Sequence, residues 1–201
     1  MWEIVFDVET KKFFDETGTS DPGDLGVSIV SVYHRKLDNT KKEEFGKLES
    51  FWEKDFDRMW KIFLEADRII GFNSISFDVR ALKPYAPAQF NKLPHFDILE
   101  KVYEKAGHRV SLNALSRDTL NNSKTDSGAN AIKYWNSGDE ASLTKLRTYC
   151  EADVVLTKDL YDFGRDKGYL KYTDHWNTAR QVEVDFSYPE NFTSVAQTSL
   201  F

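Results

Sequence analysis

The first half of the chain carries short apolar runs separated by turn residues. Residues 3–8, 26–33 and 43–48 are rich in β-branched and aromatic side chains, which predicts three strands. Residues 15–25 are rich in Asp, Gly and Pro, which is typical of a turn-containing loop. An Asp-Asn pair between the second and third runs predicts a hairpin turn.

The hydrophobic period changes at residue 50. Apolar residues recur at helical spacing from 51 to 64, and Ser50 with Glu53 matches a capping box, so we expect a helix that begins at Ser50. The remaining predicted elements are a strand over 68–72, a helix over 78–85, a strand over 95–98 that runs into a helix ending near 105, a helix capped by Ser111, an exposed loop over 121–130 and a long helix over 140–163. This order predicts an α/β fold with a mixed β-sheet flanked by α-helices.

The pattern is weaker after Tyr172. Residues 181–186 fit an edge strand, and residues 187–199 are polar and contain proline, which is typical of a loose tail. A chain of 201 residues is short enough for one core. We therefore expect one domain over 1–172 and a C-terminal extension over 173–201.

Composition narrows the class of protein. The 40% hydrophobic content excludes global disorder, no apolar run is long enough to span a membrane, and a single cysteine excludes a disulfide framework. The N-terminus is acidic and lacks a signal peptide, so we expect a cytoplasmic protein with no membrane partner. The net charge of −6 argues against a protein that attracts nucleic acid by an overall positive charge. If four of the carboxylates belong to a metal site, however, the rest of the chain has a net charge of only −2, so the net charge does not decide.

Two acidic residues end the first predicted strand. Asp7 and Glu9 are two positions apart, so their side chains point to the same face. Two carboxylates that close repel each other unless a cation lies between them. The pair is thus either a metal site or an exposed acid pair at a strand end, and the pair alone does not decide.

Two further acids lie elsewhere in the chain, one just after a predicted strand and one on the long predicted helix. Asp78 comes just after the strand over 68–72 and is either a functional carboxylate or a helix N-cap. Asp153 lies beside the apolar stripe of the long helix, with Tyr149 one turn earlier on the same face. A buried carboxylate is costly unless it is paired or binds a metal, although a contact between Tyr149 and Asp153 at the rim of the core is an alternative.

The order of these motifs carries a family resemblance. Asp-x-Glu at 7–9, Asn-x-x-x-Phe-Asp at 73–78 and Tyr-x-x-x-Asp at 149–153 resemble the DEDD-type 3′–5′ exonucleases of the ribonuclease H-like superfamily, tyrosine subgroup. The histidine subgroup would have His where this chain has Thr148. Residues 111–115 are similar to the Ser-Leu-x-x-Leu helix start of the family. The resemblance covers about residues 1–172 and implies a ribonuclease H-like mixed sheet.

Oxygen donors without clustered His or Cys favour hard cations, Mg²⁺ or Mn²⁺. The resemblance implies two such ions, about 3.5–4 Å apart, that clamp the attacking and leaving oxygens of a phosphodiester. Asp7, Glu9 and Asp153 would hold the first ion, and Asp7 would bridge to the second with support from Asp78 through water. Tyr149 would orient the attacking water or the phosphate, since an unperturbed pKa near 10 makes it a poor base.

The resemblance also implies substrate contacts. Glu9 and the backbone of Thr10 would meet the terminal 3′-hydroxyl, and Asn73 and Phe77 would line the groove. A turn-stabilising amide and a core aromatic remain the alternatives for Asn73 and Phe77. Several basic residues near the motifs either contact phosphates or belong to the solvated surface: Lys11, Lys12, Arg80, Lys83, Lys124 and Lys133.

The sequence ends in a second short motif. Residues 197–201 read Gln-Thr-Ser-Leu-Phe and are similar to the peptide with which bacterial polymerases and repair proteins bind the sliding clamp. In that reading Leu200 and Phe201 fill an apolar pocket and Gln197 forms a hydrogen bond. The alternative is an ordinary terminus whose two apolar residues fold back on the body.

Together these patterns predict a metal-dependent 3′–5′ exonuclease that acts on 3′ ends, with single-stranded DNA favoured over RNA because of the clamp-like peptide. An exoribonuclease with the same site is the alternative among enzymes. The alternative in another class is a module that binds nucleic acid or the clamp without cutting.

Overall fold

The computed structural model describes residues 1–124 and 126–188. A five-stranded mixed sheet has the order β3-β2-β1-β4-β5, and a hairpin forms a separate sheet of β6 and β7. The strands are β1 (Trp2–Thr10), β2 (Val27–Leu37), β3 (Glu43–Trp52), β4 (Arg68–Gly71), β5 (His95–Asp97), β6 (Tyr169–Thr173) and β7 (Ala179–Glu183). The first three strands are antiparallel, and β4 and β5 add in parallel beside β1. The predicted α/β fold with a mixed sheet is confirmed.

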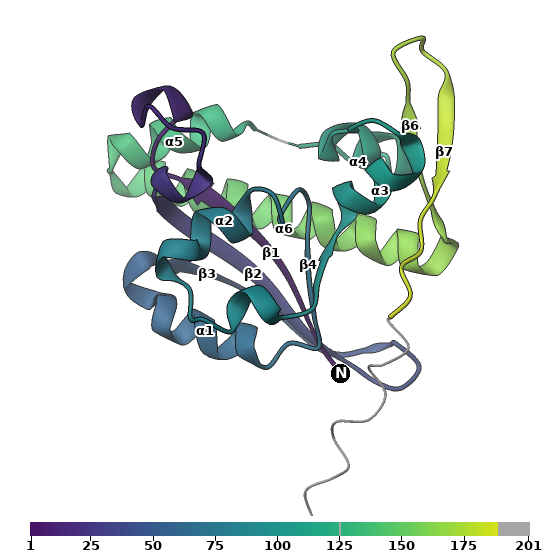
Figure 1. Ribbon diagram of the computed structural model, residues 1–201, viewed down its shortest axis with the longest axis horizontal. Coiled ribbons are helices and arrows are strands. Elements are labelled where there is room, and N and C mark those ends of the chain that lie inside the picture. The colour runs from purple at the N-terminus through teal and green to yellow at the C-terminus, as the bar shows by residue number, and fades with distance from the viewer. Residues whose placement is uncertain (125, 189–201) are drawn as a thin grey trace, which may run out of the picture.

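Six α-helices surround the sheet (Figure 1). They are α1 (Phe56–Leu64), α2 (Asp78–Leu82), α3 (Ile98–Ala106), α4 (Leu112–Leu120), α5 (Gly128–Ser137) and α6 (Glu140–Lys167). The alternation along β1 explains the layers: Ile4, Phe6 and Val8 pack with α1 and α2 on one face, whereas Val5 packs with Val154 and other residues of α6 on the opposite face. Side chains of β1 that share a face with Val5 therefore point toward α6.

The predicted helix start at Ser50 is wrong. Strand β3 continues through Trp52, and α1 begins at Phe56. The Ser50 hydroxyl lies 2.9 Å from the Ser31 hydroxyl on β2 and donates a 2.7 Å hydrogen bond to Glu151 on α6. Because these partners hold Ser50 in the strand, its side chain does not cap a helix.

The predicted loop over 121–130 is too long, because α5 begins at Gly128. This helix was not predicted, and it buries Ala131 and Ile132. Ser111 does cap α4, and its hydroxyl accepts a 3.2 Å hydrogen bond from the Ala114 amide. The long helix is also confirmed and extends to Lys167.

The region after α6 folds back onto the body. Strand β6 packs against α4, and β7 packs against α3. The predicted edge strand over 181–186 is therefore a strand of a separate hairpin rather than of the main sheet. Phe186 is buried in the core with Phe96 and Tyr161. In the described ranges, no helix has the length and apolar character required to cross a membrane.

Candidate active site

Strand β1 presents three acids on the face that it turns toward α6. Glu3 is fully buried and neutralised, since it accepts hydrogen bonds from Arg35 at 2.8 Å and from the Tyr161 hydroxyl at 3.2 Å. Asp7 and Glu9 form no ion pair within the described part of the chain. Glu3 is therefore a structural acid, whereas Asp7 and Glu9 are available for chemistry.

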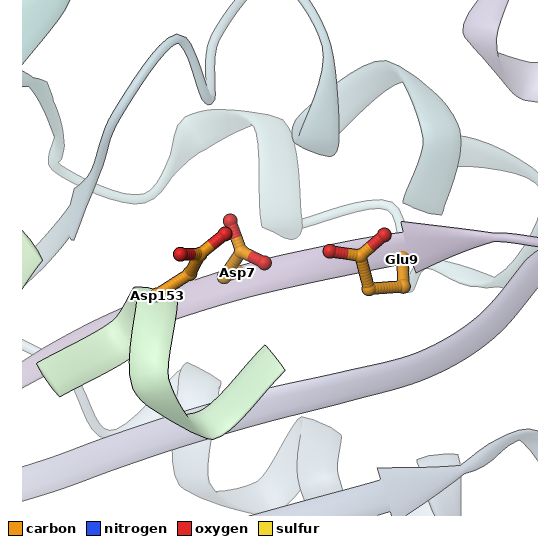
Figure 2. A group of neighbouring side chains, drawn as sticks. All are labelled: Asp7, Glu9 and Asp153. Atoms are coloured by element: carbon orange, nitrogen blue, oxygen red, sulfur yellow. The ribbon is translucent and has the colours of Figure 1, made fainter. Parts of the chain in front are cut away.

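Asp153 of α6 completes a cluster with these two acids. One carboxylate oxygen from each of Asp7, Glu9 and Asp153 lies within 4.8 Å of the other two. Figure 2 shows Asp7 and Glu9 on the strand and Asp153 opposite them on a turn of α6. Glu9 is 8% exposed and Asp153 is 3% exposed. Three carboxylates thus converge between a strand and a helix, with Glu9 and Asp153 buried and Asp7 partly exposed.

The crowding changes how these acids titrate. Burial raises the pKa of Asp7 from 3.8 to about 7, with a further contribution from the charge of Asp153. Burial and then the charge of Asp7 raise the pKa of Glu9 well above 4.5. A divalent cation among the carboxylates would offset both the burial of their charges and the repulsion between them. The all-oxygen donor set and the short distances between the oxygens fit a hard ion such as Mg²⁺ or Mn²⁺.

Asp78 lies in the same cleft but outside the cluster of three. It is the first residue of α2, and Phe77 occupies the N-cap position, so the N-cap interpretation of Asp78 is wrong. Its carboxylate instead accepts a 2.9 Å hydrogen bond from the amide of Val8, between Asp7 and Glu9. This bond ties the start of α2 to the functional part of β1.

Tyr149 is buried beside the cluster and contacts Lys124. The Lys124 ammonium lies 2.5 Å from Oδ2 of Asp153 and donates a 3.1 Å hydrogen bond to the Tyr149 hydroxyl. Burial, followed by the charges of Glu9 and Asp153, raises the pKa of Tyr149 above its ordinary value of 10. The phenol therefore keeps its proton at neutral pH and acts as a hydrogen-bond donor.

Cys150 follows Tyr149 and is fully buried. Its sulfur lies 3.7 Å from Oδ2 of Asp7, and burial raises the pKa of the thiol well above 9. A neutral, enclosed thiol is a poor nucleophile. Cys150 therefore fills space as a small buried residue.

A cleft of about 320 Å³ opens over the four acids and Tyr149. Thr10, Asn73 and Phe77 all line it. Asn73 has φ +62°, and its side-chain oxygen Oδ1 accepts a 2.7 Å hydrogen bond from the Ser76 hydroxyl, so it also stabilises its turn. Phe77 is only partly buried, so it is not a core aromatic residue.

Several cleft residues had no role in the sequence interpretation. Phe13 and Phe14 are 40% and 41% exposed, and the Phe14 ring lies edge-on to Phe77 with 6.3 Å between centroids. The sequence does contain a signal for these two rings, which is a pair of adjacent phenylalanines in a polar loop just after Asp7 and Glu9. Lys124 was noted only as one of several basic residues. Gln197, Leu200 and Phe201 lie outside the described residues.

The model of the RNase_H superfamily matches residues 4–163 of the sequence. The chain belongs to the RNase H superfamily. The matched range includes all four acids and Tyr149, and the mixed sheet with helices on both faces agrees with the RNase H-like fold. The comparison with curated proteins gives no significant match.

A solved structure of a DNA polymerase contains the same fold. The chain is similar to the family B DNA polymerase from the hyperthermophilic archaeon Pyrobaculum calidifontis, with a TM-score of 0.56 and 20% identity over 82% of this chain. A second similar structure is the zinc ion bound form of the E. coli ExoI–ssDNA complex, with a TM-score of 0.47 and 15% identity over 83% of this chain. This RNase H superfamily chain covers only 24% and 41% of those two proteins.

Proposed function

We propose that this protein is a metal-dependent 3′–5′ exonuclease of the DEDD type with a catalytic tyrosine. The observation that carries the proposal is the cluster of Asp7, Glu9 and Asp153. Asp7 and Glu9 are unlike the buried Glu3 on the same strand, because they converge on each other and on Asp153, whereas Glu3 is bound by arginine and tyrosine. Four acids and a tyrosine around one open cleft fit hydrolysis of a phosphodiester better than a purely structural role.

Asp7, Glu9 and Asp153 would hold one Mg²⁺ or Mn²⁺ ion, and Asp7 with Asp78 would hold a second. When bound, the two ions supply an activated water and stabilise the negative charge on the leaving oxygen. Asp78 has one carboxylate oxygen committed to the Val8 amide, which leaves the other oxygen for this role.

The protein's own groups position the reacting atoms. Tyr149 keeps its proton and would donate a hydrogen bond to the attacking water or to the scissile phosphate. Water forms a bond to phosphorus while the bond to the 3′ oxygen breaks, and that oxygen takes up a proton. The products are a nucleoside 5′-monophosphate and a strand shortened by one nucleotide with a new 3′-hydroxyl.

The substrate class is a single-stranded 3′ end. Glu9 and Thr10 line the cleft. Glu9 and the backbone of Thr10 would bind the terminal 3′-hydroxyl. Phe13, Phe14 and Phe77 offer partly exposed rings to the terminal bases. The cleft of about 320 Å³ has room for an unpaired nucleotide. Asn73 would contact the sugar or phosphate of the strand.

We favour DNA over RNA because of the C-terminal peptide. Gln197, Leu200 and Phe201 would bind the bacterial sliding clamp, which raises the effective concentration of an acidic nuclease at DNA. The test is binding of the full chain to a purified bacterial clamp, compared with a chain that lacks residues 197–201. Equal binding by both proteins would refute the clamp proposal and leave the nuclease proposal untouched.

The activity is tested with 5′-labelled single-stranded DNA and RNA of one sequence, incubated with Mn²⁺, Mg²⁺ or EDTA. We expect a ladder that shortens from the 3′ end with either metal, none in EDTA, and none with Asp7→Asn. Asp67→Asn is a matched control, because Asp67 lies at the opposite end of the sheet, where it accepts a hydrogen bond from Trp2. A preference for RNA would favour the exoribonuclease alternative. No cleavage of either strand, together with metal-independent binding, would favour the non-cutting module.

A further inference from the structure

Exposed apolar side chains are concentrated along one line of the surface. The described residues include eight large apolar side chains that are exposed. Five of them line the cleft or two neighbouring cavities, and these are Phe13, Phe14, Ile75, Tyr103 and Trp176. Exposed aromatic rings are costly in water, so their alignment from the cleft to the β6–β7 hairpin indicates a binding surface.

The first neighbouring cavity adjoins the cleft through Asn73, which lines both. It has a volume of about 200 Å³ and contains Ile75, Tyr103 and Arg109. The Arg109 guanidinium donates a 2.6 Å hydrogen bond to the Asn73 side chain. Tyr103 is 52% exposed. The cavity thus offers a cation and an accessible ring directly beside the cleft.

The second cavity, of about 860 Å³, lies between the end of α3 and the hairpin. Its lining includes Lys105 and His108, which lie four residues and one residue before Arg109 in the chain. In Figure 1, α3 and α4 stand between the central strands and the hairpin. Helix α3 contributes Tyr103 to the first cavity and Lys105 to the second. The residues 105–109 form the connection between the second cavity and the first.

Trp176 at the tip of the hairpin is the most exposed of the five side chains, at 72%. Its turn is held in place by Asp174, which accepts hydrogen bonds from the amides of Trp176 and Thr178 at 3.0 and 2.9 Å. The ring of His175 lies 3.5 Å from that of Trp176, centroid to centroid. The tip therefore presents an aromatic surface in a defined position.

We propose that this line of cavities binds the single strand upstream of the 3′ end, with Tyr103 and Trp176 as stacking platforms and Arg109 and Lys105 as phosphate contacts. The proposal rests on the proposed function. The hairpin lies beyond residues 4–163, the range of the family match. We call the surface formed by Tyr103, Lys105, Arg109 and Trp176 the upstream track.

Stacking dominates over charge in this surface. In the described part of the chain, Lys105 and Arg109 form no ion pair, whereas Arg180 is paired with Asp174 at 2.7 Å. Acidic Glu100 and Glu183 also line the two cavities. Two phosphate contacts on a single strand correspond to a slope of about 1.4 in a plot of log affinity against log salt. We therefore expect weak salt dependence together with a strong effect of removing an aromatic ring.

The test measures binding of labelled oligonucleotides of 3 and 12 nucleotides to the Asp7→Asn protein in EDTA, so that no cleavage occurs. Trp176→Ala and Arg109→Gln are added singly, and Leu64→Ala serves as the control, since Leu64 is a 45% exposed apolar residue on α1. We expect Trp176→Ala to weaken binding of the 12-mer about tenfold and binding of the 3-mer by less than twofold. Leu64→Ala should change neither.

The salt slope for the 12-mer should fall by about 0.7 in Arg109→Gln. DNA and RNA 12-mers of one sequence are compared, and the expected loss in Trp176→Ala applies to both because stacking does not read the sugar. If the Asp7→Asn protein binds the 12-mer equally well with and without Trp176→Ala, the proposal of the upstream track is overturned.

Cleavage of the same 12-mer by proteins with an intact Asp7 separates this result from the proposed function. If the wild-type protein cleaves the strand but the Trp176→Ala variant binds it normally, the track is wrong and the nuclease stands. If Trp176→Ala weakens binding of the strand but no protein with an intact Asp7 cleaves it, the upstream track stands as part of a binding module.

Discussion

The ammonium of Lys124 lies 2.5 Å from Oδ2 of Asp153, inside the cluster of acids that would bind metal. The same ammonium donates a hydrogen bond to Tyr149, so one lysine links the acid on α6 to the tyrosine one turn earlier. A divalent ion held by Asp153 would meet this positive charge at close range. Lys124 is therefore both a stabilising partner of Asp153 and an opponent of metal binding.

Replacing Lys124 with methionine should separate these two effects. Lys124→Met removes the charge but keeps the length of the side chain, so we expect Mn²⁺ to bind about tenfold more tightly, within the range of coupling free energies between neighbouring sites. The melting temperature in EDTA should fall, because Asp153 loses its ion pair. Titration calorimetry and thermal unfolding measure the two quantities.

Lys133→Met is the matched control, since Lys133 is an exposed lysine on α5 whose ammonium contacts only Asn130 among the described residues. It should change neither metal affinity nor melting temperature. Unchanged or weaker Mn²⁺ binding by Lys124→Met would show that the lysine does not oppose the metal.

The stability of the protein in EDTA should fall as the pH rises from about 4 to about 7. Asp7 has a pKa near 7 in the folded protein and 3.8 when unperturbed, so over this range the folded state retains a proton that the unfolded state has lost. One such group lowers the free energy of unfolding by about 1.4 kcal/mol per pH unit. Thermal melts of wild-type protein and Asp7→Asn test this.

In Asp7→Asn the side chain at position 7 cannot ionise, so stability should fall less steeply with pH. The fall that remains should come from Glu9, because its pKa is also raised. Above about pH 7, added Mn²⁺ should restore most of the stability that was lost, because metal binding requires ionised carboxylates. A melting temperature that rises between pH 4 and 7 in EDTA would contradict this description of the cluster.

Tyr149→Phe should reduce the rate of strand cleavage by about 100-fold, the usual effect of removing one donor to a transition state. Because the phenol is a donor and not a metal ligand, Mn²⁺ affinity should stay within a factor of about two. Tyr134→Phe is the control, since its hydroxyl donates to Asp126 instead. Loss of the rising limb of the pH profile, together with the loss of rate, would instead assign Tyr149 the role of a base.

The other end of β1 should matter for stability alone. Arg35 forms ion pairs with Glu3 and Asp162, both at 2.6 Å, and its side chain is 2% exposed. Arg35→Met would remove the nearer of the two cations beside the buried Glu3 and leave Arg165 at 3.8 Å. Breaking a buried ion pair typically costs about 3–5 kcal/mol. Urea denaturation measures the loss, and Mn²⁺ affinity of the folded protein should not change. A variant as stable as the wild-type protein would show that Glu3 is satisfied by Tyr161 and the surrounding residues.

The sequence predicted the parts of the site that depend on local periodicity. Asp7 and Glu9 share a face because a strand repeats every two residues, and Asp153 and Tyr149 share a face because a helix repeats every 3.6. Both expectations hold in the structure, which brings Asp7, Glu9 and Asp153 together. Local pattern and fold agree wherever the apolar stripe of an element is long.

The failures lie where tertiary contacts decide. Ser50 has the composition of a helix cap, but pairing of β3 with β2 and a hydrogen bond to Glu151 keep it in a strand. Helix α5 was missed because turn-forming residues precede it and its buried stripe is only Ala131 and Ile132. No local pattern indicates that Lys124, in the loop before α5, reaches Asp153 29 positions later.

The central claim is hydrolysis at a 3′ end by the carboxylate cluster, and the most direct measurement is the identity of the released product. Single-stranded DNA with a 3′-hydroxyl is incubated with Mn²⁺ and wild-type protein or Asp153→Asn, and the small products are identified by mass. We predict nucleoside 5′-monophosphates, released one at a time by the wild-type protein and absent with Asp153→Asn. Release of 3′-monophosphates, of internal fragments, or of equal product by both proteins would contradict the account.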